Sequence, residues 1–215
     1  MRRRIVAAVL ANTSHVLVPS TGATRLRSVT QEVCASSCER VAVVLGSGSG
    51  SISAALEGLP VATLPNVLWT AGKSAAIRCA VAWALRSGAD GLLFVHGDQA
   101  RVDRAHVDSL LSAFCETRGP VGSEVHGEVA VPAVFGIESF ARLGQLTGNR
   151  DTHEILRTTP IVKAIPWPEG AIERAIDSAI DSALGDIRAR IRGRSRATTI
   201  SDLPTDPAVS APFCP

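Results

Sequence analysis

Short apolar runs alternate along the chain with longer stretches whose apolar residues recur at helical spacing. The short runs predict buried strands at 5–10, 40–45, 61–64, 91–95, 129–135 and 161–165. The longer stretches predict helices at 24–36, 52–56, 74–86, 103–115, 137–146, 153–157 and 169–192. Strands that alternate with helices predict an α/β fold with a mostly parallel sheet, right-handed crossovers and helices on both faces.

The alternation continues without an internal repeat or a linker as far as residue 192. We therefore expect one domain over 1–192 and a disordered tail over 193–215, where the chain turns polar and proline-bearing. A length of 215 residues is sufficient for one domain with a substantial core. Pro132 interrupts the run at 129–135, so we expect that strand at an edge or a bend of the sheet.

The net charge and the cysteines indicate which kinds of binding partner and which cellular compartment are expected. The formal net charge of +2 is too small to favour nucleic acid or a membrane surface as the main partner. No apolar run is long enough to span a membrane. The five cysteines show no CxxC or Cys/His metal spacing, which favours reduced cysteines in a cytoplasmic protein. The apolar run after Arg2–Arg4 also fits the start of a signal peptide, but it is short and a first buried strand accounts for it.

The run from Gly91 to Gln99 ends a buried strand in a small residue and a carboxylate, Asp98. Open α/β sheets bind their ligands at the carboxyl ends of the strands, and a carboxylate there suits a hard cation such as Mg²⁺. A turn or helix-capping role for Asp98 is the alternative. His96 and His106 lie near it in the chain and are possible ligands, although lone histidines near a core usually have structural roles.

Two glycine-containing loops are candidate phosphate or base sites. Gly46–Ser51 follows a predicted strand, and its N–H groups could cradle a phosphate. Its spacing matches neither GxGxxG nor GxxxxGK[ST], which favours a flexible connector. Asn66, Trp69, Gly72 and Ser74 lie on a loop and at a helix start, where they could hold a base or an anionic group, while composition alone favours Ser74 as a helix cap. No Ser/His/Asp pattern for hydrolase chemistry is present.

Taken together, these segments resemble the MobA-like nucleotidyltransferase family, and within it the molybdenum cofactor cytidylyltransferases most. The resemblance spans roughly residues 5–187 and rests on the order and spacing of the segments. The matching stretches are Ile5–Ala11, Val16–Ser28, Arg40–Gly46, the Asn66–Trp69–Gly72 loop, Leu92–Gln99, Val131–Gly136, Leu143–Gly148 and Ala175–Leu184.

The resemblance implies a Rossmann-like sheet that binds an NTP, by family analogy CTP, at its carboxyl edge. Mg²⁺ then helps the phosphate of an acceptor such as molybdopterin to attack the α-phosphate, with release of pyrophosphate. A molybdoenzyme is the maturation partner that the resemblance implies. It also implies that Asp98 is the catalytic, metal-binding residue, with Asp177 in the run that matches the second metal motif. The nucleotide-binding positions that it implies are Leu10, Ala11, Asn66, Trp69, Gly72, Lys73 and Ser74.

Two departures from the family pattern bear on activity. The family signature LAAGxSxRMGxPK wraps the triphosphate, whereas here Leu10-Ala11 runs into Asn12-Thr13-Ser14-His15, about seven residues short of the pattern. The glycine, arginine and lysine of the signature are missing, which leaves Lys73, Arg25 or Arg27 to replace them. Near the end, Ala175 stands where the family's first acid would lie.

Three functional hypotheses follow from the resemblance and its departures. The first is an NTP- and Mg²⁺-dependent nucleotidyltransferase. The second is a catalytically degenerate nucleotide-binding or regulatory protein with the same fold. The third is an oxidoreductase of the nicotine blue oxidoreductase type, which ranks last because the chain shows no dinucleotide-binding fingerprint.

Overall fold

The computed structural model describes residues 3–11, 16–17, 19–20, 23–46, 49–117 and 119–168. All of them belong to one compact unit, Met1–Arg174. The helix predicted at 169–192, with Asp177, and the tail predicted at 193–215 lie outside the described residues. Within the described part, no helix is long and apolar enough to cross a membrane.

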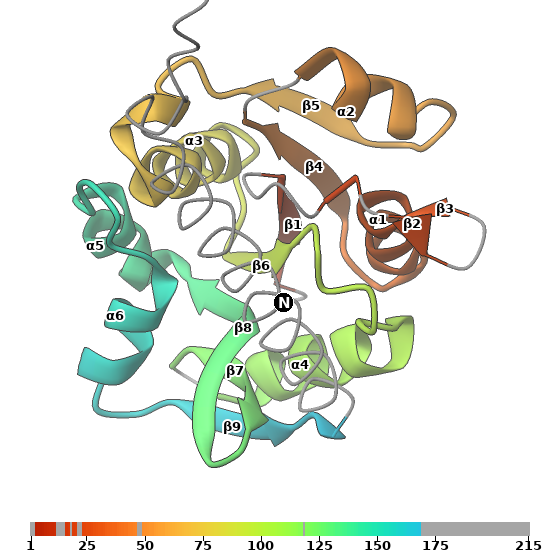
Figure 1. Cartoon of the computed structure of the whole chain (residues 1–215). Helices are drawn as coiled ribbons and strands as arrows, with labels where there is room; N and C mark the ends of the chain where they lie inside the picture. Colours follow the sequence, from red (N-terminus) through yellow and green to blue (C-terminus); the bar gives the residue numbers. More distant parts are fainter. Residues whose placement is uncertain are drawn as a thin grey trace, which may run out of the picture. The chain divides into compact units, whose positions relative to one another are not determined.

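A seven-stranded sheet forms the centre of the described part, with strand order β5-β4-β1-β6-β8-β7-β9 (Figure 1). β8 pairs antiparallel with both of its neighbours, and every other pairing is parallel. The sheet is therefore mostly parallel, as predicted, with one reversed strand. The strands are β1 (Ile5–Ala11), β4 (Arg40–Leu45), β5 (Ala62–Pro65), β6 (Gly91–His96), β7 (Val121–Val125), β8 (Glu128–Gly136) and β9 (Lys163–Pro166). A separate two-stranded sheet consists of β2 (Pro19–Ser20) and β3 (Ala23–Thr24).

Helices cover both faces of the large sheet, which confirms the predicted layers (Figure 1). One apolar cluster joins a sheet face to α1 (Arg25–Ala35), α2 (Ser49–Ala55) and α4 (Arg104–Glu116). A second cluster joins the opposite face to α3 (Lys73–Arg86), α5 (Phe140–Gly144) and α6 (Thr152–Thr158). Two short 3₁₀ helices complete the described elements: η1 (Trp69–Ala71) and η2 (Ile137–Ser139).

β1 lies in the interior of the sheet, and every one of its residues is buried. Because side chains alternate along a strand, Ala7 and Val9 pack in the first cluster while Ala8 and Leu10 pack in the second. The unbroken apolar run that predicted a strand buried on both faces is explained by this double packing.

The helix ends follow the capping residues that the sequence supplies. The Thr24 side chain accepts a hydrogen bond from the Arg27 N–H, and Asp103 does the same for the His106 N–H. With these capping residues, α1 and α4 each begin one residue later than the sequence predicts. The predicted turn at Gly46–Ser51 is wrong in part, because α2 begins at Ser49.

One strand of the large sheet, β7, has no counterpart among the predicted elements, and neither has the small sheet of β2 and β3. Gly122 and Ser123 interrupt the apolar pattern of β7, so the segment carries no clear strand signal. It forms a hairpin with β8 through His126 and Gly127, whose φ angles are 54° and 78°. Two consecutive residues with positive φ are typical of a tight type I′ turn.

Pro132 lies in β8, which is an interior strand and not the edge strand that the proline predicts. The pairing of β8 with β7 shifts here: Gly122 pairs with Ala133, but Ser123 pairs with Ala130. Val131 and Pro132 therefore fall outside the ladder, at an irregularity that tolerates a residue without an N–H group. Of the two predicted alternatives, the edge is excluded by the interior position of β8, and the irregularity in the pairing lies where the bend was expected.

A buried hydroxyl supports this irregularity. The Ser123 Oγ donates to the Pro132 carbonyl at 2.7 Å, and Ser123 is fully buried. Since that hydroxyl hydrogen is used, the His106 Nε2 donates to the same Oγ, also at 2.7 Å. The His106 ring stacks on Trp167 with 5.3 Å between ring centroids and 18° between planes. Helix α4 is thereby tied to the β7–β8 pair.

Replacing Ser123 with Ala should lower the free energy of unfolding by about 1–3 kcal/mol, because Pro132 and His106 both lose a buried partner. Urea denaturation of the wild-type and variant proteins measures the difference. The matched control is Ser109→Ala, since Ser109 is exposed and its hydroxyl donates to the Ala105 carbonyl of its own helix. Equal losses in the two variants would contradict the role assigned to Ser123.

Candidate functional site

The carboxyl ends of β1, β4 and β6 meet at one edge of the sheet because these strands are parallel neighbours. Leu10 near the end of β1 pairs with Val44 on one side and with His96 on the other. Leu10 and Ala11 are buried at this edge. The nucleotide-binding positions predicted on β1 and the metal-binding position predicted after β6 therefore lie on adjacent strands.

Asp98 follows β6 in a turn that contacts β1 and α1. The Gly97 N–H donates to the Leu10 carbonyl at 3.0 Å. A Cβ at Gly97 would lie 2.8 Å from the Leu26 Cδ1, so a larger residue here would force the Leu26 side chain of α1 to move. Asp98 is partly exposed, at the carboxyl edge of the sheet as predicted.

Gln99 is a structural residue of this turn that sequence reasoning missed. Its Oε1 accepts a hydrogen bond from the His96 N–H at 2.9 Å, and its Nε2 donates to the Val131 carbonyl at 2.9 Å. The side chain thus fixes the turn that carries Asp98 and joins it to β8. Nothing in the sequence pattern marks a glutamine for this role, because the partner from β8 is more than thirty residues away.

His96 places an imidazole beside the same turn. Its Nδ1 is buried, and it has no hydrogen-bond partner in the described part of the chain. Burial lowers the pKa of His96; Asp98 and Asp151 act in the opposite direction, and Lys73 adds to the lowering. The two carboxylates and the ammonium group therefore all act electrostatically on the His96 ring.

The loop after β5 carries Asn66 and Trp69 to the same edge. Asn66 is nearly buried; its Oδ1 accepts a hydrogen bond from the Leu68 N–H at 3.2 Å, and its own N–H donates to the Leu45 carbonyl at 3.2 Å. Trp69 is 51% exposed. A cavity of about 200 Å³ lies between this loop and α3. Its lining residues are Gly46, Asn66, Trp69, Gly72, Lys73, Ala76 and Asn149.

The start of α3 packs tightly against the Gly148 backbone. Gly72 has a φ of 96°, and a Cβ there would lie 2.4 Å from the Gly148 oxygen. The Ser74 N–H donates to the same oxygen at 3.1 Å, so this amide of the helix start is already occupied. The prediction of Ser74 as the helix cap is wrong: Gly72 is the cap residue, and the buried Ser74 Oγ accepts from Arg78 at 3.0 Å.

Two of the cations proposed to replace those of the missing signature, Arg27 and Lys73, differ in how available they are to a phosphate. Arg27 donates to the carbonyls of Ala55 and Glu57, both at 2.9 Å, and so joins α1 to the end of α2. Lys73 lines the cavity, with its Nζ 3.9 Å from the Asp151 Oδ2 and its side chain mostly exposed. Lys73 is therefore better placed than Arg27 to meet a phosphate.

The donor set at this edge fits a divalent ion that brings its own phosphate ligands. In the described residues no three His, Cys, Asp or Glu side chains gather into a metal site. Asp98 supplies a carboxylate, and Asp177 lies outside the described residues. Mg²⁺ is commonly held by one or two carboxylates together with substrate phosphates and water, so this donor set suits a metal–nucleotide complex.

Comparison with known proteins gives the family. The model of the MobA-like NTP transferase domain matches residues 12–164. The chain belongs to the MobA-like NTP transferase family. No curated protein matches the chain.

Solved structures share the fold of this MobA-like chain at low sequence identity. Rv0371c of Mycobacterium tuberculosis H37Rv, in complex with manganese, has a TM-score of 0.65 and 21% identity, covering 78% of this chain and 89% of its own. A nucleotidyl transferase from Methanothermobacter thermautotrophicus has a TM-score of 0.65 and 18% identity, covering 83% and 99%. The CMP:2-keto-3-deoxy-manno-octonic acid synthetase complexed with CTP has a TM-score of 0.57 and 10% identity, covering 76% and 88%. At these identities the likeness shows the fold alone.

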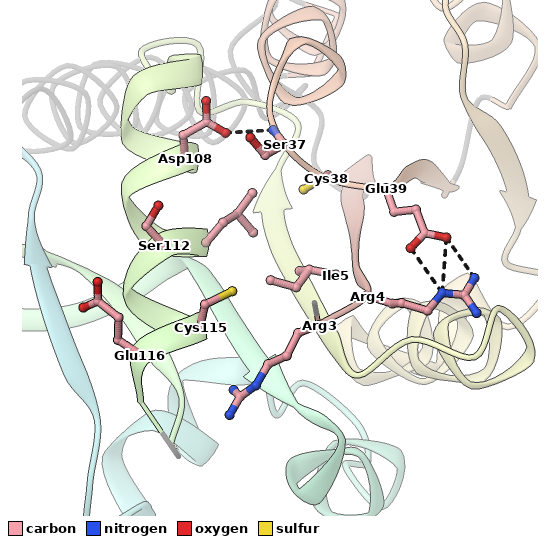
Figure 2. Close-up of a pocket in the computed structure, with 11 residues that line it drawn as sticks. Arg3, Arg4, Ile5, Ser37, Cys38, Glu39, Asp108, Ser112, Cys115 and Glu116 are labelled. Atoms are coloured by element: carbon pink, nitrogen blue, oxygen red, sulfur yellow. Dashed lines mark hydrogen bonds and ion pairs between the residues drawn. The ribbon is translucent and has the colours of Figure 1, made fainter. Parts of the chain in front are cut away.

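A second cavity, of about 780 Å³, lies at the opposite edge of the sheet, where β1 begins (Figure 2). Charged groups that line it already have partners: Arg4 pairs with Glu39 at 2.8 Å, and Asp108 accepts from the Ser37 N–H at 2.7 Å. Burial raises the pKa of the Cys38 thiol to about 11, which keeps it protonated and unreactive at neutral pH. The Arg4–Glu39 pair joins the segments before β1 and β4, and the Asp108–Ser37 bond joins α4 to the end of α1. We therefore interpret the polar groups of this cavity as structural and not as catalytic.

Replacing Gly72 with Ala should destabilise the MobA-like domain by at least ~1 kcal/mol, because a side chain at this backbone conformation is strained and would press on Gly148. Urea denaturation measures the loss. Gly144→Ala is the matched control: no atom lies within 4 Å of its added Cβ, so its stability should stay the same or rise by about 0.5–1 kcal/mol. A Gly72→Ala protein as stable as the control would refute the tight packing at the start of α3.

Proposed function

We propose that this chain is a nucleotidyltransferase that transfers CMP from CTP to a phosphorylated acceptor such as molybdopterin, with Mg²⁺. The observation that carries the proposal is a cavity lined by Trp69 and Lys73 at the carboxyl edge of the sheet, the edge at which Asp98 follows β6. Open α/β sheets bind their ligands at this edge. A cytoplasmic location and transfer of the product to a molybdoenzyme are part of the same proposal.

The cavity beside Trp69 is suited to a nucleobase. A half-exposed indole offers a flat apolar surface on which a base can stack, and its loop is held by the Asn66 turn. The volume of about 200 Å³ is suited to one base rather than to a whole nucleotide. The ribose and phosphates would then extend toward Leu10, Ala11 and Asp98, with Gly72 and Ser74 shaping the cavity wall.

The phosphates would lie between Lys73 and the metal at Asp98. Lys73 supplies a positive charge, and its pairing with Asp151 is long enough to be exchanged for a phosphate contact. Mg²⁺ when bound would neutralise phosphate charge and make the α-phosphate more electrophilic. Asp98 would hold that ion, and Asp177 is proposed as its second carboxylate. Gln99 keeps Asp98 fixed relative to β8, where the acceptor would enter.

A nucleotide-binding or regulatory protein without turnover is the second candidate. The observation that favours it is the loss of phosphate donors: the Ser74 amide binds the Gly148 carbonyl, and Arg27 binds carbonyls of α2 and the turn after it. Both donors are therefore committed to the fold. Binding of CTP alone does not separate the two candidates, whereas pyrophosphate release does.

Calorimetric titration with CTP, GTP and ATP in the presence of Mg²⁺ tests the proposal. We expect CTP to bind, and Asp98→Asn to weaken the Mg²⁺-dependent binding by about tenfold or more, because a neutral amide is a poor Mg²⁺ ligand. Asp103→Asn is the matched control, since Asn keeps the cap at the start of α4.

Each outcome of this titration has a separate meaning. If none of the three nucleotides binds at millimolar concentration, the proposed function is wrong. If Asp98→Asn binds Mg²⁺–CTP as well as the control does, the metal role of Asp98 is wrong. Release of pyrophosphate from CTP after molybdopterin is added would exclude the candidate without turnover.

Replacing Trp69 with Ala should weaken CTP binding by about 1–3 kcal/mol, since base stacking on an aromatic ring contributes that amount. The loss should be similar for ATP, because every base presents a flat face. Leu68→Ala serves as the control: Leu68 is 58% exposed and does not line the cavity. Equal affinities for the Trp69→Ala and Leu68→Ala proteins, measured by the same titration, would place the base elsewhere.

A further inference from the structure

His96 is the last residue of β6, and it lies on the sheet face that α3 covers. Leu92 and Phe94, at alternate positions of the same strand, pack in the apolar cluster of α3. Side chains alternate along a strand, so His96 continues this row toward the carboxyl edge. Two residues further on, the chain reaches Asp98.

The imidazole of His96 has one ring nitrogen without a partner. Its Nδ1 is buried and makes no hydrogen bond among the described residues, whereas buried polar atoms in folded proteins are nearly always paired. The backbone N–H of His96 donates to the Gln99 Oε1, which holds the end of the strand beside the turn that carries Asp98.

Three charged groups act electrostatically on the ring. Asp98 lies on its own turn, Lys73 at the start of α3, and Asp151 at the start of α6. A metal ion coordinates an imidazole through a ring nitrogen that carries no proton. A carboxylate and a neutral imidazole two residues apart are donors of the kind that divalent transition ions take.

We propose that His96 is a nitrogen ligand of the divalent metal ion at Asp98. The inference rests on the proposed function, since it takes the metal to be the one that accompanies the nucleotide. Mg²⁺ prefers oxygen ligands, while imidazole is a better donor to first-row transition ions. A site with one carboxylate and one imidazole therefore binds Mn²⁺ more tightly than Mg²⁺, and His96 is the residue that sets this preference.

Electron paramagnetic resonance of Mn²⁺ tests the coordination directly. Titration of the full chain with Mn²⁺, alone and with CTP, gives the Mn²⁺ affinity, and competition with Mg²⁺ gives the ratio of the two affinities. Electron spin-echo modulation of the bound Mn²⁺ should show a ¹⁴N coupling in unlabelled protein that becomes a ¹⁵N coupling in uniformly ¹⁵N-labelled protein. This label separates a protein nitrogen from the nitrogens of the cytosine base.

His96→Asn is the informative variant, because Asn keeps a polar atom near the Nδ1 position but offers oxygen as the donor. We expect it to lose the protein nitrogen coupling and to reduce the Mn²⁺ over Mg²⁺ preference by about tenfold or more. The matched control is His126→Asn, the same change at an exposed turn position whose positive φ Asn accepts. The control should keep both the coupling and the preference.

The outcomes separate this inference from the proposed function. Mn²⁺–CTP that binds without a protein nitrogen coupling overturns the inference and leaves the nucleotidyltransferase proposal intact. Absence of any nucleotide binding overturns the proposed function, while the coupling of Mn²⁺ bound without nucleotide still decides whether His96 is a ligand. The label-exchange measurement on the wild-type chain remains decisive if His96→Asn does not fold.

Discussion

Burial of β1 on both faces is the constraint on which the rest of the structure depends. A strand with no polar side chain can be stable only between two layers of helices and beside two other strands. α1 and α4 supply one layer and α3 the other, while β4 and β6 supply the parallel partners. The same pairing brings the carboxyl ends of three strands together. The candidate site is therefore a geometric consequence of how the core is built.

The sequence contains enough information for the layers and for most of the elements. The apolar run at 5–10 and the caps at Thr24 and Asp103 determine local structure directly, so β1, α1 and α4 lie within a residue of their predicted bounds. β7 is missed because Gly122 and Ser123 depend on burial against β8 for their strand conformation. The interior position of β8 is missed for a related reason: Pro132 reads as an edge signal unless the partner strand is known to skip it.

The residues of the candidate site also fall into those that the sequence could predict and those that it could not. Asp98 was predictable because a carboxylate after a buried strand has a local signature, and Trp69 because its loop resembles a family motif. Gln99 and Gly148 were not, since their roles come from contacts with residues distant in the chain. His96 could be named as a possible ligand, but its unpaired buried nitrogen is visible only in the structure. The role of Ser74 was misjudged because the Gly148 carbonyl, which takes its N–H, cannot be seen from the helix sequence.

The reversal of β8 divides the sheet into two parts with different connections. β5, β4, β1 and β6 form a parallel block, and β8, β7 and β9 form a second block. Backbone pairing between them covers Gly91 to Phe94 and ends before the carboxyl edge, where the Gln99 side chain takes over the link to Val131. The border thus depends at the functional end on one replaceable side chain. A change at Gln99 would therefore act on the border at the functional end, while the backbone pairing of Gly91 to Phe94 keeps the two blocks in register further back.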